Sequence, residues 1–120
     1  MSLTKISIQR LNTVVPELRA VILEAIKEAE IYGLNVQIAE TSRNIETQKK
    51  YLAQGNSQTL KSYHLRDKAV DVFINGGWRF EDYKKFADIV KRVASKRGKK
   101  ITWGGDWKTL IDGPHFQIES

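Results

Sequence analysis

The sequence lacks cysteine altogether, contains only two histidines, and has no long apolar run. The absence of cysteine excludes a disulfide framework, zinc fingers with thiolate ligands, iron–sulfur clusters and cysteine nucleophiles. No apolar stretch approaches the roughly 18 residues that cross a bilayer, so no transmembrane segment is expected. Residues 1–10 also lack the apolar core of a secretion signal. Any histidine chemistry must therefore use His64 and His115.

The composition is that of a soluble globular domain, with 41% hydrophobic and 28% charged residues in a chain of 120. No linker, repeat or low-complexity tract divides the chain, so residues 1–120 are expected to form a single domain. The formal net charge is +6, and residues 61–120 carry thirteen basic and eight acidic side chains. This surplus favours an anionic partner, namely nucleic acid, acidic lipid or a cell-wall polymer, or serves solubility alone.

Hydrophobic periodicity predicts an α+β fold, in which helices pack on a small, mostly antiparallel sheet. Apolar residues at three- and four-residue spacing indicate helices, and alternating apolar residues indicate strands. The predicted helices run from Pro16 to the C-cap glycine Gly33, from Ile45 to Ala53 and from Glu81 to Arg97. The predicted strands are Leu34–Ile38, Ala69–Ile74, Ile101–Trp103 and His115–Glu119, and residues 55–63 are predicted to form a loop.

Each histidine has an aspartate at an informative spacing. His64 precedes Asp71 by seven residues, and Asp71 interrupts an apolar strand, where a carboxylate is costly to bury without a cation or hydrogen bonds. Asp112 precedes His115 by three residues across Gly113-Pro114, which restricts the backbone between them. Two imidazoles and one carboxylate are the ligand set of a catalytic zinc site, and such a site is expected here on a face of the sheet.

A catalytic zinc site of this kind needs a further carboxylate to take a proton from water and deliver it to the leaving amine, and Asp112 is the candidate. The alternative interpretation is that both histidines are ordinary surface or core residues and that Asp71 caps a turn. Either pair alone favours that alternative. The two pairs together, which use every histidine in the chain, favour the metal site.

The segment Ser62-Tyr-His64-Leu-Arg-Asp-Lys-Ala69-Val-Asp71 resembles the Ser-x-His-x-x-Gly-x-Ala-x-Asp signature of the D-Ala-D-Ala metallopeptidase family. Asp112-Gly-Pro-His115 resembles the second signature of that family. Trp103-Gly-Gly-Asp-Trp107, followed by Pro-His-Phe-Gln, is most similar to its phage endolysin branch, the L-alanyl-D-glutamate peptidases. The segments 41–48 and 51–55 resemble the arginine-containing segment and the helix that follows it. The resemblance covers residues 11–118.

The resemblance implies that His64, Asp71 and His115 bind one Zn²⁺ ion per chain. It implies that Asp112 is the general base and then the general acid. Arg43 matches the arginine that holds the substrate carbonyl and stabilises the oxyanion, a role that suits a permanently charged guanidinium.

Four further residues are candidates for substrate binding: Ser62, Gln48, Trp103 and Trp107. The two tryptophans either frame a substrate groove or simply pack beside the Gly-Gly turn. One position departs from the family pattern, because Asp67 stands where the family has glycine. Aspartate tolerates a positive φ better than most residues, so the backbone can still turn there.

The expected function is hydrolysis of the peptide stem of peptidoglycan by an L-alanyl-D-glutamate endopeptidase that acts as a phage-type endolysin. The alternative within the family is a D-alanyl-D-alanine carboxypeptidase. We expect a monomer without a wall-binding domain, made in the cytoplasm without a signal peptide. It would act on the cell wall or periplasm after release by a holin-like factor.

Two other classes of function compete with this interpretation. A small metal-dependent nuclease would suit the positive charge, but it needs a ββα metal motif, whereas a long helix separates the two histidine segments here. Nucleic acid is therefore not an expected partner. A binding module that has lost catalysis would not need Asp112. The basic residues of the segment 84–100 are explained by a solvated helix face or by attraction to an anionic cell envelope.

Overall fold

A computed structural model describes residues 3–41, 68–108 and 111–119. The predicted helix 45–53 and the predicted loop 55–63 lie outside the described residues. So do five residues discussed above: Arg43, Gln48, Ser62, His64 and Asp67.

The described elements match most of the predicted ones to within two residues. Helix α2 begins at a proline in its first position, and Gly33 follows its end with φ +80°. Strands β2 and β4 have the predicted bounds. The elements in chain order are α1 (Lys5–Leu11), α2 (Pro16–Ile31), β1 (Val36–Glu40), β2 (Ala69–Ile74), α4 (Phe80–Lys96), β3 (Lys100–Trp103), the 3₁₀ turn η2 (Gly104–Asp106) and β4 (His115–Glu119).

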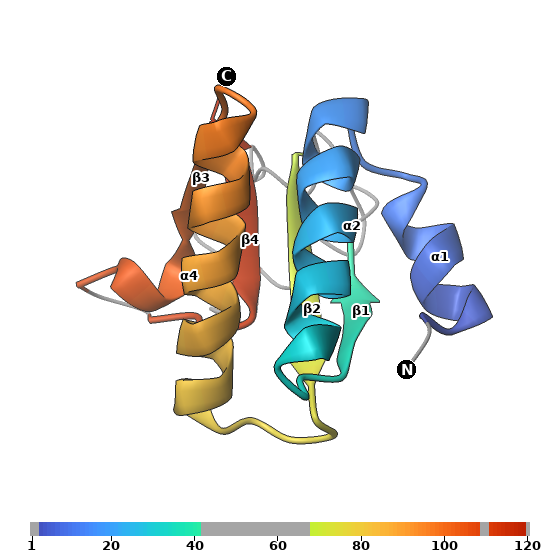
Figure 1. Cartoon of the computed structure of the whole chain (residues 1–120), viewed down its shortest axis with the longest axis vertical. Helices are drawn as coiled ribbons and strands as arrows, with labels where there is room; N and C mark the ends of the chain where they lie inside the picture. Colours follow the sequence, from blue (N-terminus) through green and yellow to red (C-terminus); the bar gives the residue numbers. More distant parts are fainter. Residues whose placement is uncertain (1–2, 42–67, 109–110, 120) are drawn as a thin grey trace, which may run out of the picture.

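The four strands form one antiparallel sheet in the order β1-β2-β4-β3. Helices α2 and α4 lie side by side on one face of this sheet (Figure 1). This arrangement confirms the predicted α+β class. None of the helices in the described ranges is both long and apolar enough to span a membrane.

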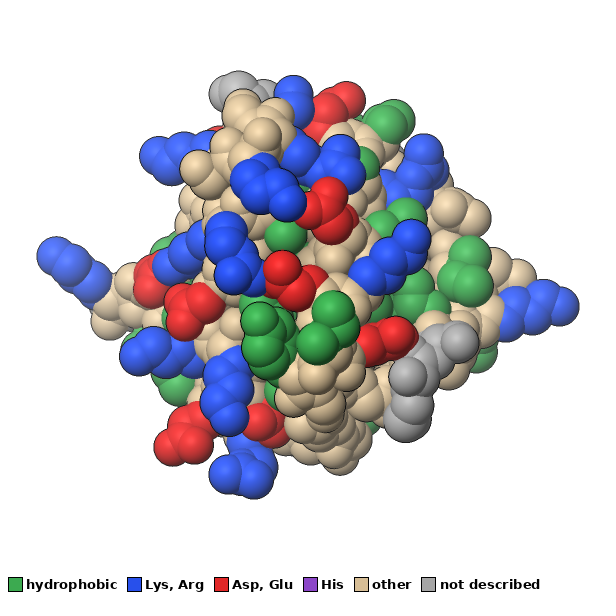
Figure 2. All heavy atoms as spheres, viewed as in Figure 1, with side chains coloured by type: hydrophobic (Ala, Val, Ile, Leu, Met, Phe, Trp, Pro, Cys, Tyr) green, Lys and Arg blue, Asp and Glu red, His purple; other side chains and the backbone are tan. Residues whose placement is uncertain are grey.

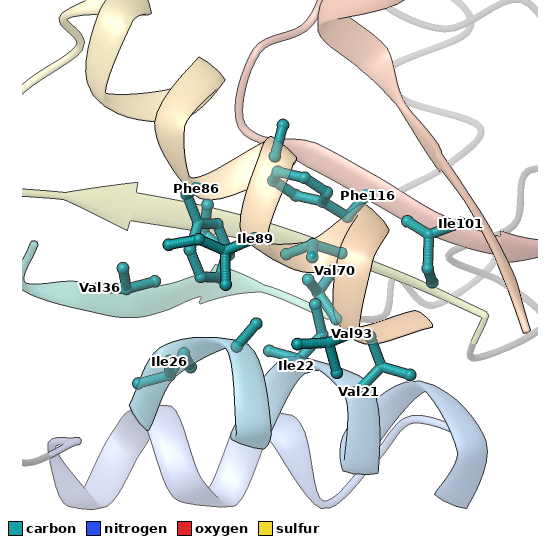
Figure 3. Close-up of a cluster of buried hydrophobic side chains, with 14 of the residues drawn as sticks. Val21, Ile22, Ile26, Val36, Val70, Phe86, Ile89, Val93, Ile101 and Phe116 are labelled. Atoms are coloured by element: carbon teal, nitrogen blue, oxygen red, sulfur yellow. The ribbon is translucent and has the colours of Figure 1, made fainter. Parts of the chain in front are cut away.

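The hydrophobic core lies between the two helices and the sheet (Figure 3). Phe86 of α4 meets Phe116 of β4 edge to face, with ring centroids 5.5 Å apart. Val70 of β2 and Ile22 of α2 are also fully buried in this cluster. Because alternate residues of a strand point to opposite faces, the same strands present their other side chains away from the helices.

Helix α1 is an element that the periodicity does not predict, because the segment 5–11 has no apolar stripe. It is held by the edge strand β1. The backbone amide of Ile38 donates to Ser7 Oγ at 2.9 Å, and Arg10 Nη1 donates to the carbonyl of Ile38 at 2.9 Å. Helix α1 therefore satisfies backbone groups that an uncovered sheet edge would expose.

Three basic residues of α4, and Arg97 directly after the helix, are paired with acidic side chains. Lysine and arginine interleave with aspartate and glutamate over the helical face (Figure 2). This pairing favours a solvated, internally compensated helix face over a continuous anion-binding stripe. The pairs are Lys91–Asp106 at 2.6 Å, Arg92–Glu28, Lys96–Glu24 at 3.3 Å and Arg97–Glu24 at 2.7 Å.

Candidate metal centre

The candidate site lies on the face of the sheet opposite to α2 and α4, where β2 and β4 run side by side. Asp71 and His115 are directly paired across these strands. The amide of Val72 donates to the carbonyl of Pro114 at 2.9 Å. The alternation of an antiparallel ladder then makes Asp71 and His115 a non-hydrogen-bonded pair, in which side chains come closest. The register therefore brings the carboxylate to the imidazole, with Asp71 Oδ1 3.2 Å from His115 Nδ1.

Asp112 reaches the same place through the turn that precedes β4. The amide of His115 donates to the carbonyl of Asp112 at 3.1 Å, and the amide of Asp112 donates to the carbonyl of Gly104 at 3.0 Å. A Cβ atom on Gly104 would lie 2.2 Å from the carbonyl oxygen of Asp112. Only glycine allows the turn η2 to approach this closely, so Gly104 is part of what positions Asp112.

Trp103 fixes the same turn from the core side. It is 4% exposed, and its indole Nε1 donates to the carbonyl of Gly113 at 2.7 Å. Its ring also packs against Phe80 and Phe116. These contacts favour the packing role for Trp103, and contact between this side chain and substrate stays a prediction.

Trp107 flanks the site directly. Its half-buried ring lies against the imidazole of His115, with centroids 5.1 Å apart and an interplanar angle of 42°. The indole therefore forms one wall of the site and shields one side of the imidazole. This position suits the predicted substrate-binding role, which stays a prediction.

Asp71, Asp112 and His115 each offer a donor atom, and these atoms lie within 4.8 Å of one another. His115 is 6% exposed and the two carboxylates are partly buried. Carboxylate oxygen and imidazole nitrogen are ligands that Zn²⁺ accepts, and donors around one tetrahedral zinc ion stand about 3.4 Å apart. This donor set fits a metal site.

The contact between Gln117 and His115 is not predicted from the sequence. Its Oε1 lies 2.6 Å from Nε2 of His115, and its Nε2 donates to Glu119 Oε1 at 3.2 Å. The alternation of β4 places these side chains on the face that carries His115. The alternation of β4 indicates that Gln117 lies near His115, but it does not indicate which ring nitrogen Gln117 contacts.

Comparisons with known proteins point to one family. The family model for phage L-alanyl-D-glutamate peptidases matches residues 1–118. The L-alanyl-D-glutamate peptidase of Listeria phage A118 is 32% identical over 119 residues, which cover 93% of this chain. The crystal structure of the Serratia marcescens L-Ala D-Glu endopeptidase ChiX superposes with a TM-score of 0.89 at 35% identity, covering 98% of this chain and 90% of that one.

A family model and a solved peptidase structure thus both match this α+β domain over nearly its whole length. The chain belongs to the phage L-alanyl-D-glutamate peptidase family. It spans 40% of the length of the Listeria phage relative.

Proposed function

We propose that this chain is a zinc-dependent peptidase that hydrolyses the bond between L-alanine and D-glutamate in the peptide stem of peptidoglycan. The observation that carries the proposal is the convergence of Asp71, Asp112 and His115 on one face of the sheet. Family membership supports the substrate class, since the matched relatives are named for this bond. Action as a phage-type endolysin is part of the proposal.

Asp71 and His115, together with His64, would hold the zinc ion. A bound zinc ion supplies a Lewis acid that polarises a carbonyl and lowers the pKa of water. The metal identity is proposed from the donor chemistry, because two imidazoles and a carboxylate suit zinc better than the all-oxygen sites of magnesium or calcium.

Asp112 would move the proton in the reaction. Its carboxylate accepts a proton from the attacking water, the new C–O bond forms at the carbonyl of L-alanine, and the C–N bond breaks. The proton passes to the leaving amine of D-glutamate, so the carboxylate is regenerated. The hydrogen bond between Asp112 and Gly104 holds the residue in place through the cycle.

Other side chains would bind and orient the stem peptide. The guanidinium of Arg43 would meet the oxyanion, and Trp107 would form a wall of the groove beside His115. Ser62 and Gln48 would line the same groove. We further propose that the protein acts as a monomer on the wall after release from the cytoplasm through a holin-like factor.

Digestion of purified sacculi tests the proposed bond. The soluble fragments are analysed by mass spectrometry after treatment with the zinc-loaded protein. A new amino terminus at D-glutamate supports the proposal. Loss of terminal D-alanine alone would instead assign the carboxypeptidase activity, and intact sacculi would refute hydrolysis of the wall.

A further inference from the structure

Exposed aromatic side chains lie beside the candidate metal centre, at the end of the sheet where β2 leads into α4 (Figure 1). Trp78, in the connection between these elements, is 64% exposed. Its ring meets the edge of the half-buried ring of Phe73, with centroids 4.8 Å apart. Phe73 lies on the same face of β2 as Asp71, two residues further along the strand. An aromatic surface therefore continues from the metal centre to the end of the sheet.

Trp78 is held in place although it is exposed. The turn 75–76 has a positive φ at both residues, and the chain returns from it to Gly77. The hydroxyl of the buried Tyr83 donates to the carbonyl of Gly77 at 2.6 Å. The ring of Tyr83 also stacks on the indole of Trp78, with centroids 6.0 Å apart and an interplanar angle of 9°. The exposed part of the indole is thus a preorganised surface, which costs little ordering when a ligand binds.

The sheet face has a different character on the other side of the metal centre. Gln117 pairs with Ala69, so it lies toward the start of β2. Its amide donates to Glu119 Oε1 at 3.2 Å, and Thr102 Oγ1 donates to the same oxygen at 2.6 Å. The candidate centre is therefore bordered by an aromatic surface at one end and by polar side chains at the other.

The two sides of the proposed scissile bond differ in the same way. In peptidoglycan the amino group of L-alanine is joined through a lactyl group to a sugar ring of the glycan strand, whereas D-glutamate continues into the charged stem. A sugar ring presents C–H groups that pack on the electron-rich face of an indole. Extended L-alanine and lactyl groups span about two residue lengths, or roughly 7 Å. The advance along β2 from Asp71 to Phe73 is also about 7 Å.

We propose that Trp78, supported by Phe73 and Tyr83, binds the sugar ring to which the stem peptide is attached. The contact would direct the glycan strand to the aromatic end of the sheet face and the charged stem to the polar end. Trp78 is a binding residue in this proposal and takes no part in the proton transfers. The direction of the substrate rests on the proposed function, whereas the affinity of this surface for the glycan can be measured without hydrolysis.

A pair of substrates tests the contribution of Trp78 to hydrolysis. One is a muropeptide with its sugars, and the other is the same stem peptide with an acetyl group in place of the lactyl group and sugars. Trp78→Ala should lower kcat/KM for the muropeptide about 3- to 10-fold, through KM, and leave the acetylated peptide unaffected. Tyr32→Ala removes an aromatic side chain that is 66% exposed at the end of α2, and it should resemble the wild type on both substrates. An equal loss on the two substrates, or no loss on either, would overturn the proposal.

NMR of the indole N–H groups tests binding separately from hydrolysis. The chain has three tryptophans, and the signal of Trp78 is identified by its loss in Trp78→Phe. The full chain is titrated with glycan strands from which an amidase has removed the stem peptides, so the L-alanyl-D-glutamate bond is absent. We expect a saturable shift of the Trp78 signal.

The two measurements together separate the proposals. A titration that leaves the Trp78 signal in place would overturn glycan binding at this surface, whether or not the signal of Trp107 moves. A shift of Trp78 by a chain that releases nothing from sacculi would refute the proposed peptidase function and leave the glycan-binding surface intact.

Discussion

The two faces of the sheet differ although the same strands build both. On the helix-covered face, Val70 and Phe116 are 0% exposed and belong to one apolar cluster. On the opposite face, Asp71 and His115 converge with Asp112 in a polar cluster. Neighbouring residues of one strand therefore have different roles: His115 belongs to the polar cluster and Phe116 to the hydrophobic core.

Because of this difference, residues that determine folding stability and residues that determine the chemistry of the site can be distinguished along each strand. Apolar burial on the helix side supplies the free energy that fixes the register of β2 and β4. That register in turn places Asp71 opposite His115. Changes on the helix side should therefore reduce folding stability first, whereas changes on the other face should reduce metal binding or hydrolysis while the fold persists.

The largest expected effect falls on catalysis. Asp112→Ala removes the proposed proton carrier, and positioned acid–base groups contribute about 10²- to 10⁴-fold to rate. We expect hydrolysis of sacculi to fall by that factor while the far-UV spectrum and the thermal midpoint stay near those of the wild type. The matched control is Asp88→Ala, which removes an exposed aspartate of α4. Wild-type lysis by Asp112→Ala would exclude this residue as the base.

On the helix-covered face, Phe116→Ala should lower the free energy of unfolding by about 3–5 kcal/mol, because it leaves a cavity beside Phe86. Urea denaturation measures the change. Ile31→Ala is the control, since Ile31 is 80% exposed and its truncation should alter the stability by about 0.5 kcal/mol or less. Equal effects of the two substitutions would contradict the location of the core.

An intermediate effect is expected where the two faces are coupled through η2. Gly104→Ala places a Cβ atom against the backbone of Asp112. Overpacking of this kind costs about 1–3 kcal/mol, and the displaced turn should also slow hydrolysis. Gly77→Ala is the matched control, because no atom lies within 4 Å of the Cβ position there. Unchanged activity in Gly104→Ala would show that the position of Asp112 does not depend on this contact.

The smallest effect concerns the ion pairs on the helices. Hydrogen bonds from Arg97 lower the pKa of Glu24 below its usual value of 4.5. A lowered pKa means that the pair stabilises the fold above about pH 4.5 and that this contribution is lost as the pH falls further. Urea midpoints of wild type and Glu24→Gln should differ slightly at pH 7 and converge at acidic pH. A difference that grows on acidification would reverse the predicted sign.

The sequence predicts the regular elements well because their signals are local. Strand β4 alternates residue by residue, and α2 has a proline start and a glycine end, so both are found within two residues of their bounds. Helix α1 is not predicted from the sequence, because tertiary hydrogen bonds to Ile38 hold it in place rather than an apolar stripe.

The site is predictable in its residue types and less so in its supporting contacts. The spacing of Asp112 and His115 indicates their association, which the structure brings about through a tight turn. The close approach of Gly104 to Asp112 joins segments whose contact depends on the path of η2. The contact of Gln117 with His115 depends on the side-chain conformations of two residues on one face of β4, which periodicity does not report.

Zinc titration by calorimetry, with the wild type beside His115→Ala and Asp112→Ala, tests the metal centre most directly. We expect one zinc ion per wild-type chain, loss of tight binding in His115→Ala, and retention of zinc in Asp112→Ala. Circular dichroism checks that each variant is folded. Undiminished binding by folded His115→Ala would contradict the assignment of the ligands, and loss of zinc from folded Asp112→Ala would make Asp112 a ligand rather than the proton carrier.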